Sequence, residues 1–207
     1  MTNHNALRGF YSPRAGTIAH AANLQFGGLE VTGPATVGGA PILTRRYAMG
    51  APQAGDTVAN TTTETAFASA YPVPANDMTV GRFYRLLASG IYSVNAAGPR
   101  LNVRVKLGAT ELVVDGPVFG ATARSNRPWR LEALITVLSS GASGSVRASG
   151  AGRLFTSANS PFEFELFTVG AITVDTTVAQ TLGLTATWNI AATANSVTQQ
   201  QLTVDAG

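Results

Sequence analysis

Apolar and polar residues alternate along two segments of the chain, residues 100–108 (RLNVRVKLG) and residues 181–190 (TLGLTATWNI). Successive side chains of a β-strand point to opposite faces of a sheet, so strict alternation gives a strand one apolar and one polar face. The apolar rows consist of Leu101, Val103, Val105 and Leu107 in the first segment, and of Leu182, Leu184, Ala186, Trp188 and Ile190 in the second. Both segments are therefore predicted to be half-buried β-strands.

Further strand-like segments follow one another from Asp56 to the end of the chain. They are separated by short runs of turn-forming residues, as in YPVPAND and SGASG. β-Branched residues dominate these segments, and no helical periodicity is sustained. About eight strands in about 150 residues are typical of a sandwich. We therefore expect an all-β domain, an antiparallel β-sandwich of the jelly-roll type, with an immunoglobulin-like sandwich as the alternative.

The last predicted strand, SVTQQQLTVDA, does not follow the alternation. Its TQQQ segment, residues 198–201, would place polar side chains on both faces of the strand. An edge position, or contact with a neighbouring subunit, would explain such a strand.

Residues 1–55 differ from the rest of the chain in being rich in Gly, Ala and Pro, with apolar stretches too short to build a core. Phe10, Tyr11 and Tyr47 nevertheless supply aromatic side chains. We predict an extended N-terminal arm, residues 1–55, that becomes ordered on a partner, followed by the β-sandwich domain, residues 56–207. A strap that covers the protein's own domain is an equal alternative.

Charge is unevenly distributed between these two regions. The net charge of +3 lies entirely in residues 1–55, where Arg8, Arg14, Arg45 and Arg46 outweigh Glu30, while basic and acidic residues balance in residues 56–207. Because basic residues are few and never cluster beyond two, we expect no nucleic-acid partner. Only 12% of all residues are charged, and a surface of small uncharged residues suits close contact with other proteins.

Several functional classes lack the residues they need. The chain has no cysteine, which excludes disulfides and thiolate chemistry. No apolar run reaches the roughly 20 residues of a membrane span, and the first residues, MTNHNALRGFYSPRAG, lack the hydrophobic segment of a signal peptide. We expect a protein made in the cytoplasm with no membrane partner.

Candidate catalytic residues are few. The two histidines, His4 and His20, lie in the predicted arm, so the β domain has no histidine for a triad or a metal site. Glu163 and Glu165 share one strand face and could form a carboxylate pair, as could Glu111 and Asp115. We interpret both pairs as the solvent face of a strand. The prediction is a protein without catalytic activity, metal or cofactor.

Arginine beside an aromatic residue is a pattern that recurs at protein interfaces. The predicted partner-binding residues of the arm are Arg8, Phe10, Tyr11, Arg45, Arg46 and Tyr47. The alternative interpretation is that the arginines are solvated charges and that the neighbouring tyrosine packs locally.

A second candidate contact region is the segment ARSNRPWR, residues 123–130, which contains three arginines and Trp129. It could present a surface for a glycan or an acidic partner. We favour Trp129 as a core residue instead, because it begins a predicted strand.

The order of motifs in residues 57–205 resembles small structural domains of tailed bacteriophage virions. The motifs are VANTTTETAFASAYPVPANDMTVGRFYRLLASGIYSVN, LNVRVKLGATELVVDG, WRLEALITVLSSGASGSVRASG and LGLTATWNIAATANSVTQQQLTV. The resemblance implies a jelly-roll-like domain, often trimeric, that serves as a head decoration protein, a head fibre or a tail part. It carries no catalytic signature, and it does not include the N-terminal region.

The resulting hypothesis is a virion structural protein, a capsid decoration (cement) or head-fibre protein. It would form a homo-oligomer, a trimer, through its β domain and bind a major capsid or tail protein through its arm. One alternative is a glycan-binding receptor module of a tail fibre. Another is the coat protein of a small icosahedral virus, whose basic arm would neutralise the genome.

Overall fold

We describe the protein from a computed structural model of its 207 residues. The structure describes residues 36–37, 40–41, 45–48, 56–95, 99–113, 123–157, 160–168 and 170–207. The chain divides into two compact units, Met1–Ile42 and Leu43–Gly207. In the first unit, the described residues form one antiparallel pair, β1 (Thr36–Val37) with β2 (Ala40–Pro41).

The second unit contains a large antiparallel sheet of eight strands. Its strands are β3 (Arg45–Ala48), β4 (Thr57–Ala59), β7 (Phe83–Val94), β10 (Arg124–Ser139), β11 (Gly144–Ser157), β12 (Ser160–Phe167), β13 (Ile172–Val174) and β15 (Ser196–Ala206). The order across the sheet is β12-β11-β10-β7-β15-β3, with β13 beside β11 and β4 beside β15.

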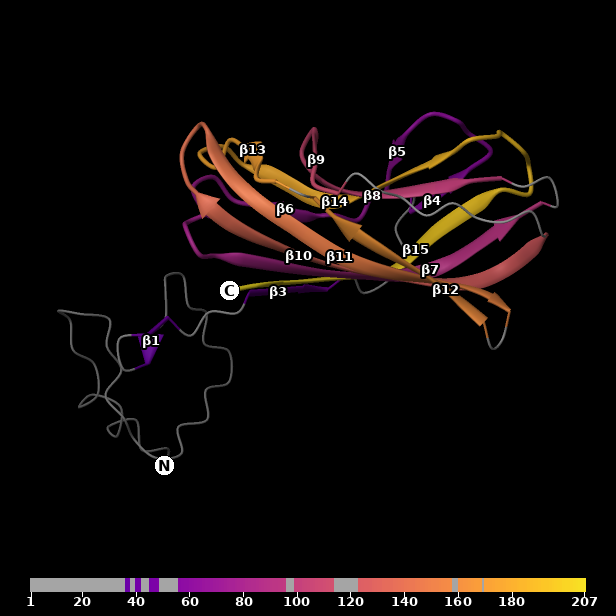
Figure 1. Cartoon of the computed structure of the whole chain (residues 1–207), viewed down its shortest axis with the longest axis horizontal. Helices are drawn as coiled ribbons and strands as arrows, with labels where there is room; N and C mark the ends of the chain where they lie inside the picture. The colour runs from indigo at the N-terminus through magenta and orange to yellow at the C-terminus, as the bar shows by residue number, and fades with distance from the viewer. Residues whose placement is uncertain are drawn as a thin grey trace, which may run out of the picture. The chain divides into compact units, whose positions relative to one another are not determined.

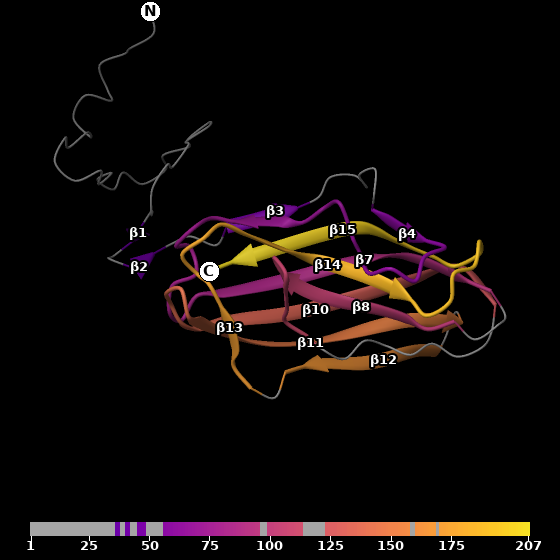
Figure 2. The same ribbon diagram turned by 90° about the horizontal axis from the view of Figure 1, so that it is seen from above.

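A smaller sheet of five strands packs on the large one. It consists of β5 (Thr65–Ala66), β6 (Tyr71–Val73), β8 (Leu101–Leu107), β9 (Thr110–Glu111) and β14 (Gln180–Trp188). Figures 1 and 2 show the two layers of this unit from perpendicular directions. The prediction of an all-β antiparallel sandwich is confirmed, and the jelly-roll type of its connections stays a prediction.

One continuous apolar core fills the space between the two sheets. The alternating rows predicted for β8 and β14 lie in it: Leu101 and Trp188, for example, are fully buried. For one residue of the predicted rows, the prediction of burial is wrong. Ile190 is 41% exposed, because β14 ends at Trp188 and the chain bends at Asn189.

The closing strand β15 is an interior strand, so of the two explanations for its polar residues the edge position is wrong, and contact with a neighbouring subunit stays a prediction. It pairs with β7 on one side and with β3 and β4 on the other. The pairing with β7 shifts between Gln199 and Gln201, which leaves Gln200 as an extra residue. This bulge allows Gln199 and Leu202 both to be buried. The Gln199 Nε2 atom donates a hydrogen bond to the Ser69 carbonyl at 3.0 Å, so the polar side chain has a partner inside the core.

The sandwich begins earlier than the predicted boundary after residue 55. β3 pairs with the C-terminal strand, with Arg46 opposite Asp205 and Ala48 opposite Thr203. Residues 45–48 of the predicted arm therefore belong to the large sheet, and the division between the two units falls between Ile42 and Leu43.

Candidate protein-binding surface

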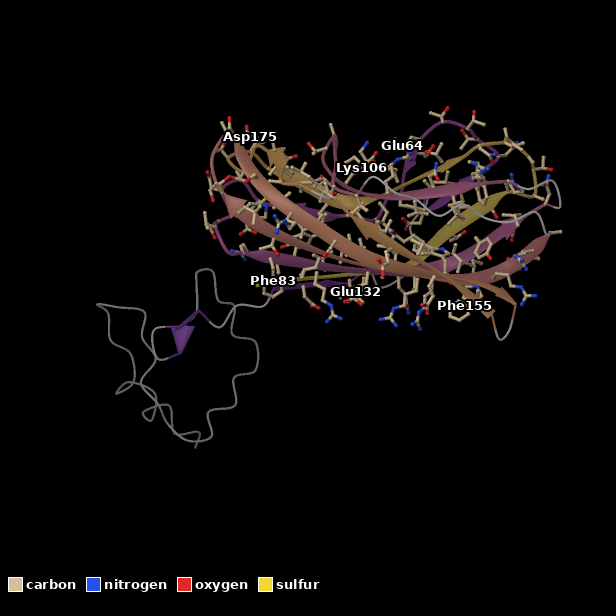
Figure 3. The ribbon with its side chains drawn as sticks, viewed as in Figure 1. Glu64, Phe83, Lys106, Glu132, Phe155 and Asp175 are labelled. Carbon is tan, nitrogen blue, oxygen red and sulfur yellow. The ribbon has the colours of Figure 1, made fainter. Side chains whose placement is uncertain are left out.

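The large sheet has one face on the core and one face toward solvent, which we call the large-sheet face. Along β7 and β10, buried residues alternate with exposed or half-buried ones, as a sheet with one solvated side requires. Figure 3 shows Phe83, Glu132 and Phe155 on this side, and Glu64 and Lys106 on the opposite side of the sandwich.

Strand register arranges the outward side chains in rows that cross the large-sheet face. Arg85 of β7 lies opposite Leu134 of β10 and Asp205 of β15. In the next row, Ala151 of β11 lies between Glu132 of β10 and Glu165 of β12. Side chains directly opposite one another on a face lie close enough to interact. The rows therefore bring together residues that are far apart in the sequence.

Charged side chains of both signs share this face. They are Arg85, Arg130, Arg147, Arg153, Glu132, Glu163, Glu165 and Asp205. Four arginines and four carboxylates give these described side chains a formal charge of zero. Among the described side chains the face is therefore mixed in sign, without a basic or an acidic excess.

Two ion pairs form among the described side chains of the large-sheet face. The Arg85 Nε atom lies 2.7 Å from Glu132 Oε1, and the Arg153 Nη2 atom lies 2.9 Å from Glu163 Oε1. The hydrogen bond from Arg85 to Glu132, followed by the charge of that carboxylate, raises the pKa of the Arg85 guanidinium. All four side chains are at least 40% exposed, so solvent screens both pairs and each contributes little to stability.

Three further charged residues of the face have no side-chain partner among the described residues: Arg130, Arg147 and Glu165. Arg130 lies opposite Arg153 in the β10–β11 ladder, and the Arg153 guanidinium is paired with Glu163. These three side chains are consequently available to groups outside the described part of the chain.

Ala151 forms the floor of a shallow groove of about 520 Å³ on the large-sheet face. Long charged side chains form its rims, namely those of Arg130, Glu132, Arg153, Glu163 and Glu165. The groove exists because the register places one small side chain between two glutamates and beside two arginines. The groove is open to solvent and has charged side chains along its rims.

Exposed apolar side chains gather next to the charged rows. Phe83 lies opposite Thr136, and Leu134 and Leu138 lie two residues before and after Thr136 on β10. Phe83 is 38% exposed, Leu134 44% and Leu138 40%. Half of the large apolar side chains found exposed in the described residues therefore lie together near one end of the large sheet.

The outer face of the small sheet is different, because its charges are paired with each other. The Arg104 Nε atom lies 3.0 Å from Glu111 Oε2, and the Lys106 Nζ atom lies 3.0 Å from Glu64 Oε1. The Thr185 hydroxyl also donates to Glu64, at 2.7 Å. These hydrogen bonds, with that of Thr185 the largest cause, lower the pKa of Glu64. This face is internally satisfied, and it holds β9 and the segment before β5 against the sheet.

The interpretation of Glu163 and Glu165 as the solvent face of a strand is confirmed, since both residues are exposed. Glu163 and Glu165 do share one face of β12, as predicted, but Glu163 is engaged by Arg153. Glu111 is engaged by Arg104, and Asp115 lies outside the described residues. No group of three or more His, Asp or Glu side chains arranged to bind a metal occurs in the described part of the chain.

The predicted contact residues fall into three groups. Arg8, Phe10 and Tyr11 lie outside the described residues, as do His4 and His20. Arg45, Arg46 and Tyr47 are in β3, whose backbone pairs with β15; their role in binding a partner stays a prediction. In the third segment, Trp129 is only 3% exposed, which confirms the core interpretation and removes Trp129 as a platform for a sugar.

The large-sheet face itself was not predicted from the sequence. The sequence feature that could have indicated this face is the presence of apolar residues at outward positions of two predicted strands, GRFYRLLASGIYSVN and WRLEALITVLSS. Phe83, Leu134 and Leu138 are such residues. A solvated strand face normally lacks such residues, but which of them gather depends on the register between strands.

Searches against protein-family models, curated proteins and solved structures found no match to this chain. Among the described residues, no helix has the length and apolar character needed to cross a membrane.

Proposed function

We propose that the protein is a structural component of a phage virion, a capsid decoration (cement) or head-fibre protein. Its sandwich, of the jelly-roll type, is the body that forms a homo-oligomer, a trimer. Its N-terminal residues bind a major capsid or tail protein. The proposal builds on the resemblance of residues 57–205 to virion domains, and it needs no catalytic group.

The observation that carries the proposal is that the body begins with a strand paired into its large sheet. The body, Leu43–Gly207, starts with β3, which pairs with the C-terminal strand β15 in the large sheet. Residues 1–42, rich in Gly, Ala and Pro, precede this strand. A pulling force on the N-terminal residues would be transmitted to β3, which is hydrogen-bonded to β15 in the large sheet. The pairing would therefore keep a bound N-terminal segment connected to a folded body.

The mechanism of such a protein is attachment. A homo-oligomer presents one N-terminal segment per subunit, so that several weak contacts act together on one particle. Arg8 and Arg14 supply positive charge in this segment, and Phe10 and Tyr11 supply aromatic side chains. Arginine and tyrosine are enriched among residues that dominate protein interfaces.

The experiment compares the full chain with a truncation that lacks residues 1–42, so that β3 is retained. Both proteins are added to particles that lack the protein, and the amount bound per particle is measured after sedimentation. Circular dichroism and solution mass serve as controls for an intact body. The proposal predicts that the truncated protein folds and keeps its oligomeric mass but no longer binds. Full binding by the truncated protein would contradict it.

A further inference from the structure

The two outer faces of the sandwich differ in how far their polar groups are satisfied. On the small sheet, Glu64, Lys106 and Arg104 are tied into ion pairs with their neighbours. On the large-sheet face, Arg130 and Glu165 have no partner in the described part of the chain. Among the described residues, exposed large apolar side chains also gather on this face and not on the strands of the small sheet. The large-sheet face therefore has the character of a surface that is covered by a partner.

Charge restricts the kind of partner that fits. The described side chains of the face carry four positive and four negative charges in interspersed rows. A nucleic acid or a strongly acidic protein requires a basic excess, which the described side chains of this face do not supply. A mixed and neutral surface instead fits another mixed and neutral surface, because each sign then finds its opposite without net repulsion. The chain itself supplies such a surface.

We infer that the large-sheet face is the surface through which copies of this chain associate, with a second copy as the occupant. Leu134 and Phe83 provide the apolar part of this interface. The groove over Ala151 receives a side chain of the neighbouring copy, and Arg130 and Glu165 on its rims find opposite charges there. This inference rests on the proposed function, because it names the surface by which the body forms its homo-oligomer.

The first test is the mass of the full chain in solution. Wild-type protein is expected to sediment as a multiple of the 21.3 kDa chain. Leu134→Arg adds a charge to the apolar part, and Ala151→Arg fills the groove; both are expected to reduce the mass to that of one chain. Ile190→Arg is the matched control, since Ile190 is 41% exposed against 44% for Leu134 but lies beyond the end of β14. It is expected to keep the wild-type mass.

A second measurement does not depend on disruptive variants. The chain has no cysteine, so Leu134→Cys and Ile190→Cys each introduce a single thiol whose reaction with a maleimide reports exposure. Leu134→Cys is expected to be protected at concentrations where the oligomer forms and to react after dilution to single chains. Ile190→Cys is expected to react under both conditions.

The inference would be overturned by a wild-type protein that sediments as one chain, or by an oligomer that survives both arginine variants. It would also be overturned by a thiol at position 134 that reacts in the oligomer or stays protected in single chains. The last outcome would point to coverage by the chain's own residues. The proposed function is decided separately by binding to particles, so an oligomer that uses another surface would refute only the inference.

Discussion

The indole nitrogen of Trp129 donates a hydrogen bond to the carbonyl oxygen of Thr198, at 3.1 Å. These residues belong to β10 and β15, which lie on either side of β7 in the large sheet. The residue of β7 in the same row is Gly90, which pairs with both Trp129 and Gln199. A Cβ atom at Gly90 would overlap the Thr198 carbonyl and lie 2.9 Å from the indole nitrogen. The hydrogen bond therefore requires a glycine at this position.

Gly90→Ala is expected to destabilise the protein, because the added methyl group must displace either the Trp129 indole or the β15 bulge. The cost should be about 1–3 kcal/mol, as for other overpacked sites, and chemical denaturation measures it. Gly170→Ala is the matched control, since no atom lies within 4 Å of a Cβ built there. Equal stability of the two variants would contradict the packing described.

Tyr84→Phe is expected to lower stability more than Tyr92→Phe. The Tyr84 hydroxyl donates to the Asp77 carboxylate at 2.9 Å, whereas the Tyr92 hydroxyl donates to the Phe155 carbonyl at 3.2 Å. Burial, followed by the hydrogen bond to Asp77, raises the pKa of Tyr84. Hydrogen bonds to charged groups contribute about 1.5–3 kcal/mol, against about 0.5–1.5 kcal/mol for neutral pairs. Urea unfolding of both variants checks the order, and the reverse order would contradict it.

Glu64→Gln is expected to remove a pH-dependent part of the stability. The hydrogen bonds from Thr185 and Lys106 lower the pKa of Glu64 in the folded protein below its ordinary value of 4.5. The stabilisation is therefore present above the unfolded-state pKa and is lost as the pH falls through the folded-state pKa. Because Glu64 is about one-third exposed, the difference from wild type should be at most about 1 kcal/mol at pH 7.

Unfolding curves measured at neutral pH and at a pH below 4 should show this difference decreasing toward zero at the lower pH. Thr62→Ala is the control, since Thr62 is exposed, carries no titrating group and lies two residues before Glu64. Its difference from wild type is expected to be the same at both pH values. A Glu64→Gln difference that is constant with pH would exclude the ion pair as its cause.

Two truncations are expected to separate the attachment segment from the sandwich. Removal of residues 1–42 should leave the free energy of unfolding of the body unchanged, while removal of residues 1–50 also deletes β3 and exposes the edge of β15. The longer truncation should lose on the order of 1–3 kcal/mol, since each backbone hydrogen bond contributes about 0.5–1.5 kcal/mol. Thermal unfolding of the two proteins checks this, and equal midpoints would argue against the β3–β15 pairing.

The sequence predicted the strands whose alternation is local. The rows of β8 and β14 could be read directly, because a residue such as Val105 or Leu184 needs only its own neighbours to define a face. The position of Gln199 could not be predicted, because a single extra residue, Gln200, changes which side chains face the core. A polar residue in the core also requires a partner such as the Ser69 carbonyl, which is distant in sequence.

The candidate surface was harder to predict for a related reason. Ala151 becomes a groove floor only because β10 and β12 place Glu132 and Glu165 on either side of it. Register between strands is a non-local property, set by turns, bulges and the core together. Composition indicated a protein that binds other proteins, but not which face it would use.

If the protein is a building component of a virus particle, it must be found in particles purified from the cells that produce it. Quantitative mass spectrometry of such particles measures its copy number. We expect the chain to be present in many copies per particle and to remain bound through purification. Particles free of the chain, with the protein abundant in the surrounding lysate, would rule out this role.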